Sequence, residues 1–262
     1  MTTRSTSMAN AAMWKKNSLL PNFERRGNLA ELMDAPDCDE RLLLNTIRQF
    51  ASINRLVARY RTILKKEVIN EMLKEPGRPY HLVDMGAGGC DIDAWLLRKT
   101  KRLGLDLRIT ACDLDPRIVR YAQSNFGHIP GLDIVETDLL DPCLSEPVDF
   151  VFANHFLHHL TDEMIVDLLK LWVPRVRHRL VFSDLARSRL AYMGFSVLSL
   201  FYRRSFTRYD GLISIQRGFT WDELEKLAGK AREHNRFNVE GLAIGRLVCT
   251  IEGAHPDLPK KH

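Results

Sequence analysis

The sequence has few cysteines, and none of them is spaced for a disulfide or a zinc site. The five in 262 residues lie far apart, and no two form a C-x-x-C pair (Cys38, Cys90, Cys112, Cys143 and Cys249). Scattered cysteines in odd number are typical of reduced thiols, so we expect the chain to work in the cytoplasm. The first twenty residues lack an apolar core of signal-peptide length, and we therefore do not expect export.

Long apolar runs and long basic runs are also missing. The longest apolar stretch, residues 190–202, is shorter than the roughly 20 residues of a membrane-spanning helix. Three interpretations stay open for this stretch: a buried helix, a lid over a lipophilic substrate, or a face that touches a membrane transiently. The first two are favoured. The net charge of +5 is spread over short Lys/Arg pairs, so we expect no nucleic-acid partner.

The first third of the chain indicates a helical segment. After a polar stretch, residues 1–26, which we expect to be a flexible tail, apolar residues recur every three or four positions from Leu43 to Val68. This spacing predicts one long amphipathic helix within a helical cap, residues 27–77. Asp37 and Glu40 have capping-box spacing at its start, and the sequence KEPGRP, residues 74–79, ends it.

From residue 78 onward, short apolar runs alternate with helical patterns, which predicts an α/β fold with a doubly wound parallel sheet. Helix starts are expected after Asp115, after Thr161, and at the capping box of Thr220 with Glu223. Each candidate strand ends in a polar residue, and such ends share one edge of a parallel sheet (Asp84, Asp113, Asp138, Asn154 and Asp184). We therefore predict a crevice with a polar, mostly acidic rim.

A glycine-rich loop, HLVDMGAGGCDID at residues 81–93, follows the first strand. A nicotinamide-dinucleotide loop favours a small residue at its sixth position, where this chain has Asp91. Asp84 precedes the first glycine, and its negative charge would repel a pyrophosphate. A positively charged ligand fits the loop better than a dinucleotide does.

Four features in order resemble the class I S-adenosylmethionine-dependent methyltransferases of the seven-stranded, small-molecule type. They are the loop D-x-G-x-G, the acid Asp113 at the next strand end, the sequence TDLLD, and DFVFANHFLHHL at the fourth strand. The resemblance implies a Rossmann-like S-adenosylmethionine-binding domain, residues 78–252. It also implies a substrate-lid insertion at 187–217 and a C-terminal tail at 253–262.

The resemblance assigns roles to the rim. Gly86 and Gly88 would let the backbone approach the cofactor, Asp84 would hold its methionine amino group, and Asp113 would accept from both ribose hydroxyls. The remaining cofactor contacts would surround the adenine and the methyl end (Leu114, Asp138, Leu139 and Asn154). Cys90 replaces a third glycine of many relatives, and we expect it to be tolerated.

Histidines after the fourth strand are the candidates for catalysis. His158 and His159 resemble the pair that assists deprotonation in quinone and natural-product methyltransferases. Candidate substrate contacts are one more histidine and three residues of the lid (His155, Arg187, Arg208 and Tyr209). We expect no metal site, because no cysteine or carboxylate stands at ligand spacing from these histidines.

The acceptor predicted from this likeness is a small, lipophilic aromatic, quinol or polyketide-like molecule, methylated at oxygen. The alternatives are carbon methylation of a quinone type, a protein that binds S-adenosylmethionine without turnover, and, from another class, a nicotinamide-dependent oxidoreductase. The sequence does not indicate an oligomeric state.

Overall fold

A computed structural model describes residues 21–139, 147–230, 236–243 and 245–253. Cys143, the predicted tail up to residue 20, and all of the predicted C-terminal tail except Gly253 lie outside the described residues. Seven strands form one sheet: β1 (Pro79–Met85), β2 (Asp106–Asp113), β3 (Leu132–Glu136), β4 (Val148–Asn154), β5 (Val176–Leu185), β6 (Phe237–Ala243) and β7 (Arg246–Glu252).

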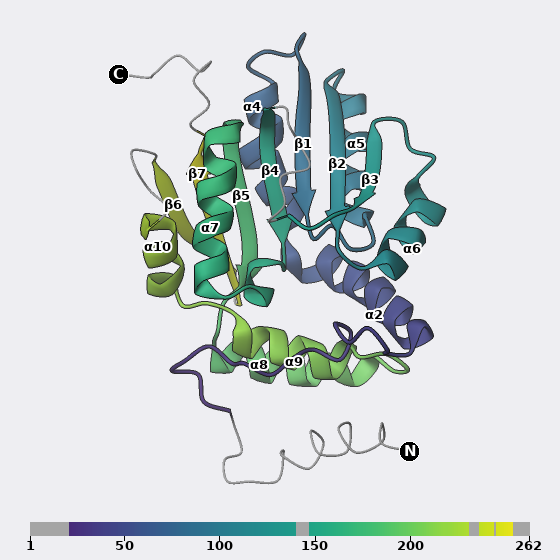
Figure 1. Ribbon diagram of the computed structural model, residues 1–262, viewed down its shortest axis with the longest axis vertical. Coiled ribbons are helices and arrows are strands. Elements are labelled where there is room, and N and C mark those ends of the chain that lie inside the picture. Colours follow the sequence, from purple (N-terminus) through teal and green to yellow (C-terminus); the bar gives the residue numbers. More distant parts are fainter. Residues whose placement is uncertain (1–20, 140–146, 231–235, 244, 254–262) are drawn as a thin grey trace.

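The strand order is β3-β2-β1-β4-β5-β7-β6, and only β7 runs antiparallel to both of its neighbours. The chain winds outward from β1 in both directions, as predicted for a doubly wound fold. All five parallel strands therefore end at one edge of the sheet (Figure 1). The predicted polar residues lie at or just beyond these ends, so the expected rim is present.

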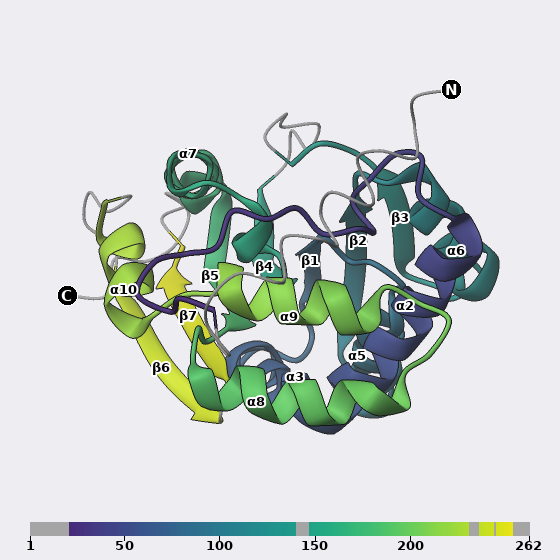
Figure 2. The same ribbon diagram turned by 90° about the horizontal axis from the view of Figure 1, so that it is seen from below.

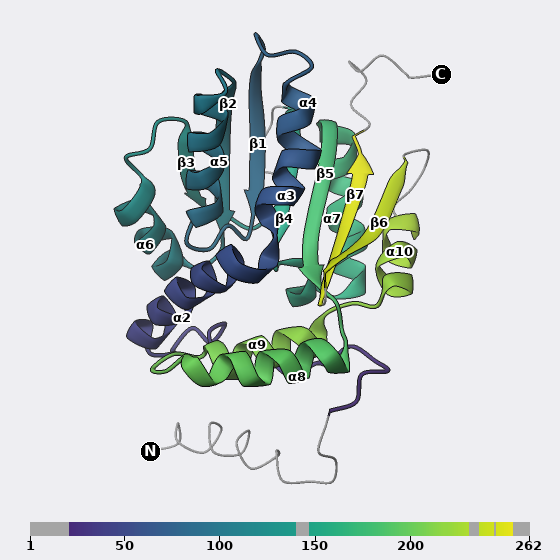
Figure 3. The same cartoon turned by 180° about the vertical axis from the view of Figure 1, so that it is seen from behind.

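Helices cover both faces of the sheet and its carboxyl edge (Figures 1 and 3). One face packs against α7 and α10, and the other against α3, α5 and the π-helical segment η3. The helices are α2 (Glu40–Ile53), η2 (Asn54–Ala58), α3 (Tyr60–Leu64), η3 (Lys65–Ile69), α4 (Asn70–Met72), α5 (Asp91–Arg102), α6 (Pro116–Phe126), η4 (Leu157–His159), α7 (Asp162–Trp172), η5 (Val173–Arg175), α8 (Arg189–Leu198), η6 (Ser199–Phe201), α9 (Thr207–Arg217) and α10 (Trp221–Lys230).

The predicted long N-terminal helix is interrupted. Arg59 adopts a left-handed backbone conformation with φ of +51°, and π-helical turns lie on both sides of α3. The apolar residues before the break face α6, whereas those after it join the sheet core, so one apolar pattern serves two packing partners. α2 accordingly runs at an angle to α3 and α4 (Figure 3).

Most predicted helix starts are confirmed. The side chains of Asp115 and Thr161 cap α6 and α7, and Thr220 and Glu223 exchange the two hydrogen bonds of a capping box. The capping box predicted at Asp37 is wrong. Asp39 caps α2 instead, because its carboxylate accepts hydrogen bonds from the first free backbone N–H groups of that helix.

The segment predicted as a lid forms α8 and α9, which cross the carboxyl edge of the sheet next to each other (Figure 2). α8 is not a buried helix. Tyr192 is its only buried residue, while Met193 and Val197 are 53% and 63% exposed. Among the described residues, no helix combines the length and the apolar character needed to cross a bilayer.

Candidate functional site

A cavity of about 1020 Å³ lies between the carboxyl edge of the sheet and the layer formed by α2, α8 and α9. This volume is at the upper limit of the range of about 300–1,000 Å³ for small-molecule sites, so it has room for two ligands. One end is bounded by the loops after β1, β2 and β3. The other is bounded by the histidines after β4 and by α8 and α9.

The glycine loop has the backbone that close approach to a ligand requires. Gly86 and Gly88 have φ of +66° and +56°, and a Cβ at Gly88 would meet nothing within 4 Å. A Cβ at Gly86 would lie 2.6 Å from the Phe156 ring, so a larger residue is excluded there. Cys90 also has a positive φ, of 57°, which explains why a glycine suits its position.

Two buried carboxyl groups lie behind this loop. Asp84, at the end of β1, hydrogen bonds to Asp93 in the first turn of α5, which requires a shared proton. Burial and the neighbouring acid raise the pKa of Asp84, and burial raises that of Asp93 to about 7. Asp84 Oδ1 has no hydrogen-bond partner within the described part of the chain, and Asp84 lines the cavity.

Asp113 fixes the loop from the neighbouring strand. Its Oδ2 accepts from the Gly88 N–H at 2.9 Å, and its Oδ1 accepts from the Asp115 N–H at 3.0 Å. Each carboxylate oxygen has a further lone pair that can accept from a ligand. Farther along the rim, Leu114 is 68% exposed and Leu139 is buried, and both line the cavity with Asp138.

A buried arginine stands at the end of β4. Arg246, from β7, donates to Asn154 Oδ1 at 3.0 Å and to Ser183 Oγ at 3.1 Å, and its Nη2 lies 2.6 Å from His155 Nε2. Burial, and after it the Arg246 charge, lower the pKa of His155 well below its usual value, so the ring is neutral. Arg246, Asn154 and His155 all line the cavity.

The two histidines of η4 lie against carboxylates from distant parts of the chain. His158 Nδ1 is 2.7 Å from Asp184 Oδ1, and its Nε2 is 3.5 Å from Glu31 Oε1. Burial alone would lower the pKa of His158, but the two carboxylates outweigh it and raise the pKa to about 9. With its pKa near 9, His158 carries a proton at neutral pH and is not a free base.

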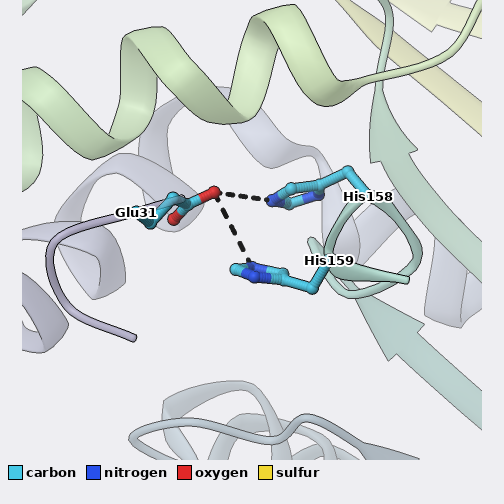
Figure 4. A group of neighbouring side chains, drawn as sticks. All are labelled: Glu31, His158 and His159. Atoms are coloured by element: carbon cyan, nitrogen blue, oxygen red, sulfur yellow. Dashed lines mark ion pairs between the residues drawn. The ribbon is translucent and has the colours of Figure 1, made fainter. Parts of the chain in front are cut away.

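His159 is the more accessible of the two, with 29% of its side chain exposed. Its Nδ1 lies 3.3 Å from Asp34 Oδ2, and its Nε2 lies 4.0 Å from the same Glu31 oxygen that His158 faces. Figure 4 shows the Glu31 carboxylate opposite both rings. We name Glu31, His158 and His159 the histidine–glutamate cluster.

Glu31 reaches the cluster on an irregular segment that several side chains hold in place. The Asp210 carboxylate in α9 accepts from the backbone N–H groups of Leu32 and Met33 at 2.7 and 3.1 Å. Ser214, one turn later, donates to Glu31 Oε1 at 2.8 Å. The segment is thus fixed to α9 through the Glu31 carboxylate itself and through the two residues that follow it.

Residues 83–171 match the model of a methyltransferase-domain family. This span carries most of the glycine loop, the rim acids Asp84, Asp113 and Asp138 and the two histidines, within a seven-stranded, doubly wound sheet of the type that the resemblance implies. The chain is a class I S-adenosylmethionine-dependent methyltransferase. The predicted family, cofactor and enzyme class are confirmed. Among curated proteins, none matches the chain significantly.

Solved structures share the fold of this methyltransferase. Two plantazolicin methyltransferases, BamL with a triazolic desmethylPZN analog and SAH and BpumL with SAH, each match 82% of this chain. The match covers 96% and 95% of those chains, with TM-scores of 0.59 and identities of 13% and 15%. The CMeT domain of the citrinin polyketide synthase has a TM-score of 0.52 and 15% identity over 73% of this chain and 51% of its own.

The residues of the methyltransferase fit S-adenosylmethionine. Asp84 lines a cavity in which the cofactor would place positive charge, and its Oδ1 has no hydrogen-bond partner among the described residues. Open space above Gly88 admits a ligand against the backbone, and Asp113 offers two oxygens to hydroxyl groups. All eight residues predicted to bind the cofactor line this one cavity (Asp84, Gly86, Gly88, Asp113, Leu114, Asp138, Leu139 and Asn154).

The predicted substrate contacts divide. His155 lines the cavity with His158 and His159, but three lid residues do not (Arg187, Arg208 and Tyr209). Arg187 is buried beneath the lid, where it pairs with both oxygens of Glu223 and donates to the carbonyls of Phe23 and Gly218. The Arg187 guanidinium is thus engaged in contacts within the fold. The expectation that Arg187 contacts the substrate is therefore corrected.

Sequence reasoning missed two polar groups of the site. Glu31 lies far from the methyltransferase motifs, and no local spacing connects it with the histidines. Arg246 follows a glycine at the start of an otherwise apolar strand, which is a weak signal that a buried cation stands there. A charged residue inside an apolar strand is the pattern that would have singled it out.

Proposed function

We propose that the methyltransferase transfers a methyl group to an oxygen of a small, lipophilic aromatic, quinol or polyketide-like acceptor. The observation that carries the proposal is the two-ended cavity, acidic at one end and mostly apolar at the other. The apolar end is lined by side chains such as Phe195, Leu198 and Ile215, and the histidine–glutamate cluster supplies polar groups there. A flat, apolar molecule with one hydroxyl group matches that lining.

At the donor end, we propose that Asp84 holds the methionine ammonium and that Asp113 accepts from the ribose hydroxyls. Asp138, between Leu114 and Leu139, accepts from the adenine amine, and Asn154 faces the methyl end. When bound, S-adenosylmethionine supplies an electrophilic methyl group on its sulfonium sulfur. These side chains fix its orientation, and the cover of α8 and α9 limits the access of water.

At the acceptor end, His158 and His159 act together with Glu31 as the catalytic groups. They bind the acceptor hydroxyl, and His159, the more exposed of the two histidines, takes up its proton, which makes the acceptor oxygen nucleophilic. His155 and Arg246, beside Asn154, contact a second oxygen of the acceptor. Arg246 is buried and forms no ion pair with any described carboxylate, and such a guanidinium favours a carbonyl or an anionic oxygen.

A transfer assay tests the function. The chain is incubated with S-adenosylmethionine labelled in its methyl group and a mixture of phenols, quinols and hydroxy-polyketides, and products are resolved by mass spectrometry and NMR. We expect an O-methylated product. Label on ring carbon would establish carbon methylation of a quinone type instead. Tight cofactor binding without transfer to any acceptor would overturn the proposal in favour of a binding protein.

Exposed apolar side chains of α8 and of η6, which follows it directly, support a transient membrane contact that delivers the acceptor. Phe201 is 82% exposed, Val197 is 63% exposed, and exposed arginines flank the helix at 189, 203 and 204. An apolar face between arginines is typical of helices that lie on anionic lipid. We propose a cytoplasmic protein that takes its acceptor from such a surface.

Vesicle sedimentation tests this contact. We expect binding to vesicles of phosphatidylglycerol, weaker binding to phosphatidylcholine, and a loss of binding in Phe201→Ser. Leu103→Ser, at the C-cap of α5, is the matched control because Leu103 is 40% exposed and lies away from α8. Equal sedimentation of both variants would exclude this surface as the contact.

A further inference from the structure

The histidine–glutamate cluster brings three metal-ligating atoms together at one point of the cavity. Oε1 of Glu31 lies 3.5 Å from His158 Nε2 and 4.0 Å from His159 Nε2, and the three ligand atoms lie within 4.8 Å of one another (Figure 4). We infer that these residues bind one divalent transition-metal cation of the zinc class.

The spacing is close to that of a tetrahedral site. With metal–ligand bonds of about 2.0–2.1 Å, neighbouring ligand atoms of a tetrahedron are roughly 3.3 Å apart. The two distances from Glu31 are slightly longer, so small movements of the rings bring all three atoms to bonding distance. Two imidazoles with one carboxylate select zinc, cobalt or iron over magnesium and calcium, which prefer oxygen ligands.

A second observation is the support behind each imidazole. His158 directs Nδ1 to Asp184 at 2.7 Å, and His159 directs Nδ1 to Asp34 at 3.3 Å. Histidine ligands of metals characteristically donate this other N–H to a carboxylate, which leaves the Nε2 lone pair for the metal. Both rings therefore direct Nε2 toward Glu31, and a cation bound there would replace the Nε2 proton of His158.

Charge also favours a cation. The side chains of Glu31 and Asp184 are each only 1% exposed, and Asp34 adds a third negative group near them. A buried carboxylate is costly unless it is paired. A divalent cation balances two of these charges and also explains why the second imidazole faces the same glutamate oxygen.

The site has room for a further ligand. All three residues line the cavity, so three protein ligands leave a fourth position directed at the acceptor end. A cation there would bind the acceptor oxygen and lower the pKa of its hydroxyl group, whose proton passes to solvent. Binding of the cation is independent of the proposed reaction, and only this role rests on the proposed function.

Metal titration of the full chain tests the inference. The protein, without an affinity tag, is stripped with EDTA, dialysed and titrated with Zn²⁺ by calorimetry and with Co²⁺ by visible absorption. We expect about one equivalent to bind, with the absorption of a low-symmetry, four-coordinate Co²⁺ site. Glu31→Gln and His159→Gln should each weaken binding more than 100-fold, and Asp34→Asn about 10–100-fold.

Two controls keep the result interpretable. His128→Gln removes an exposed histidine outside the cavity and should leave metal binding unchanged. Binding of S-adenosylhomocysteine by each variant shows that the fold is intact. If the stripped chain binds no stoichiometric cation, or if binding survives both Glu31→Gln and His159→Gln, the inference is overturned. If methyl transfer persists in EDTA, the proposed function holds without the metal site. If the cation binds but no acceptor is methylated, the metal site holds and the proposed function does not.

Discussion

The two ends of the cavity are built in different ways. The donor end comes from three adjacent strand ends and the loops that follow them, so its carboxylates lie within one continuous stretch, residues 84–139. The acceptor end is formed by Glu31 from the irregular segment before α2, by the turn after β4, and by α9. The first is a consequence of sheet topology, and the second is assembled by long-range tertiary contacts.

This difference implies that the two ends can be altered separately. A donor-end variant should change the affinity for S-adenosylhomocysteine, and an acceptor-end variant should change stability or acceptor kinetics without that loss. The substitutions below test the separation, beginning with the largest expected effect.

Asp184→Ala should lower the free energy of unfolding by about 3 kcal/mol or more, because it leaves the buried His158 imidazolium with one carboxylate in place of two. Urea denaturation measures the loss, and Asp167→Ala, on the exposed side of α7, is the control. The affinity for S-adenosylhomocysteine should not change below the unfolding transition. A loss below 1 kcal/mol would show that the histidine is not held as a cation.

Asp113→Ala should weaken binding of S-adenosylhomocysteine about 30-fold, or about 2 kcal/mol, because a charged partner of the ribose and of the Gly88 N–H is lost. Calorimetry measures the affinity. Asp133→Ala, an exposed acid on the neighbouring strand β3, should bind normally. Unchanged binding in Asp113→Ala would remove this carboxylate from the cofactor site.

Gly194→Leu should raise KM for the acceptor about 10-fold without changing cofactor affinity. Gly194 lines the cavity from α8, and a Cβ there meets nothing within 4 Å, so the larger side chain takes space from the acceptor. Gly194→Ala is the matched control, with a small effect. Equal losses of cofactor and acceptor binding would show that the two ends do not act separately.

Asp93→Asn should flatten the dependence of stability on pH by about 1–2 kcal/mol. The folded pKa of Asp93, about 7, is above its ordinary value of 3.8, so the folded state holds its proton more tightly than the unfolded state. The resulting stabilisation is complete below pH 4 and is lost as the pH rises toward 7. Denaturation series at several pH values should show this decline in the natural chain only; parallel curves would contradict it.

Cys90→Gly should change stability by less than about 1 kcal/mol, because relief of the left-handed backbone offsets the loss of a buried side chain. Cys90→Val should be clearly worse, since a β-branched residue disfavours a φ of +57°. Thermal melts compare the two. A large loss of stability in Cys90→Gly would show that packing of the Cys90 side chain outweighs the cost of its left-handed backbone.

The donor end was predictable because its signal is local. Asp84, Gly86 and Gly88 lie within five residues of the sequence, and the acids at later strand ends repeat the same placement. Parallel topology then brings those ends together without further information. The parallel strands and the helices between them follow from the same alternation of apolar runs and caps, whereas the strand order and the antiparallel direction of β7 were not predicted.

The acceptor end was only half predictable. The sequence singled out His158 and His159. Their carboxylate partners Glu31 and Asp34, in the irregular segment before α2, could not be found, because no periodicity links residues so far apart. Arg187 was assigned to the substrate although it is buried in an ion pair with Glu223. Sequence pattern alone does not distinguish an arginine that faces a cavity from one that joins two elements of the fold.

The irregular segment that carries Glu31 has a consequence for how such an enzyme changes over evolutionary time. It is attached to α9 and, through the carbonyls of residues 35 and 36, to Arg117 at the start of α6. Mutations in this segment can therefore remodel what is methylated while the methyl source stays the same. Related enzymes can thus come to methylate different acceptors while the strand ends and loops that bind S-adenosylmethionine stay unchanged.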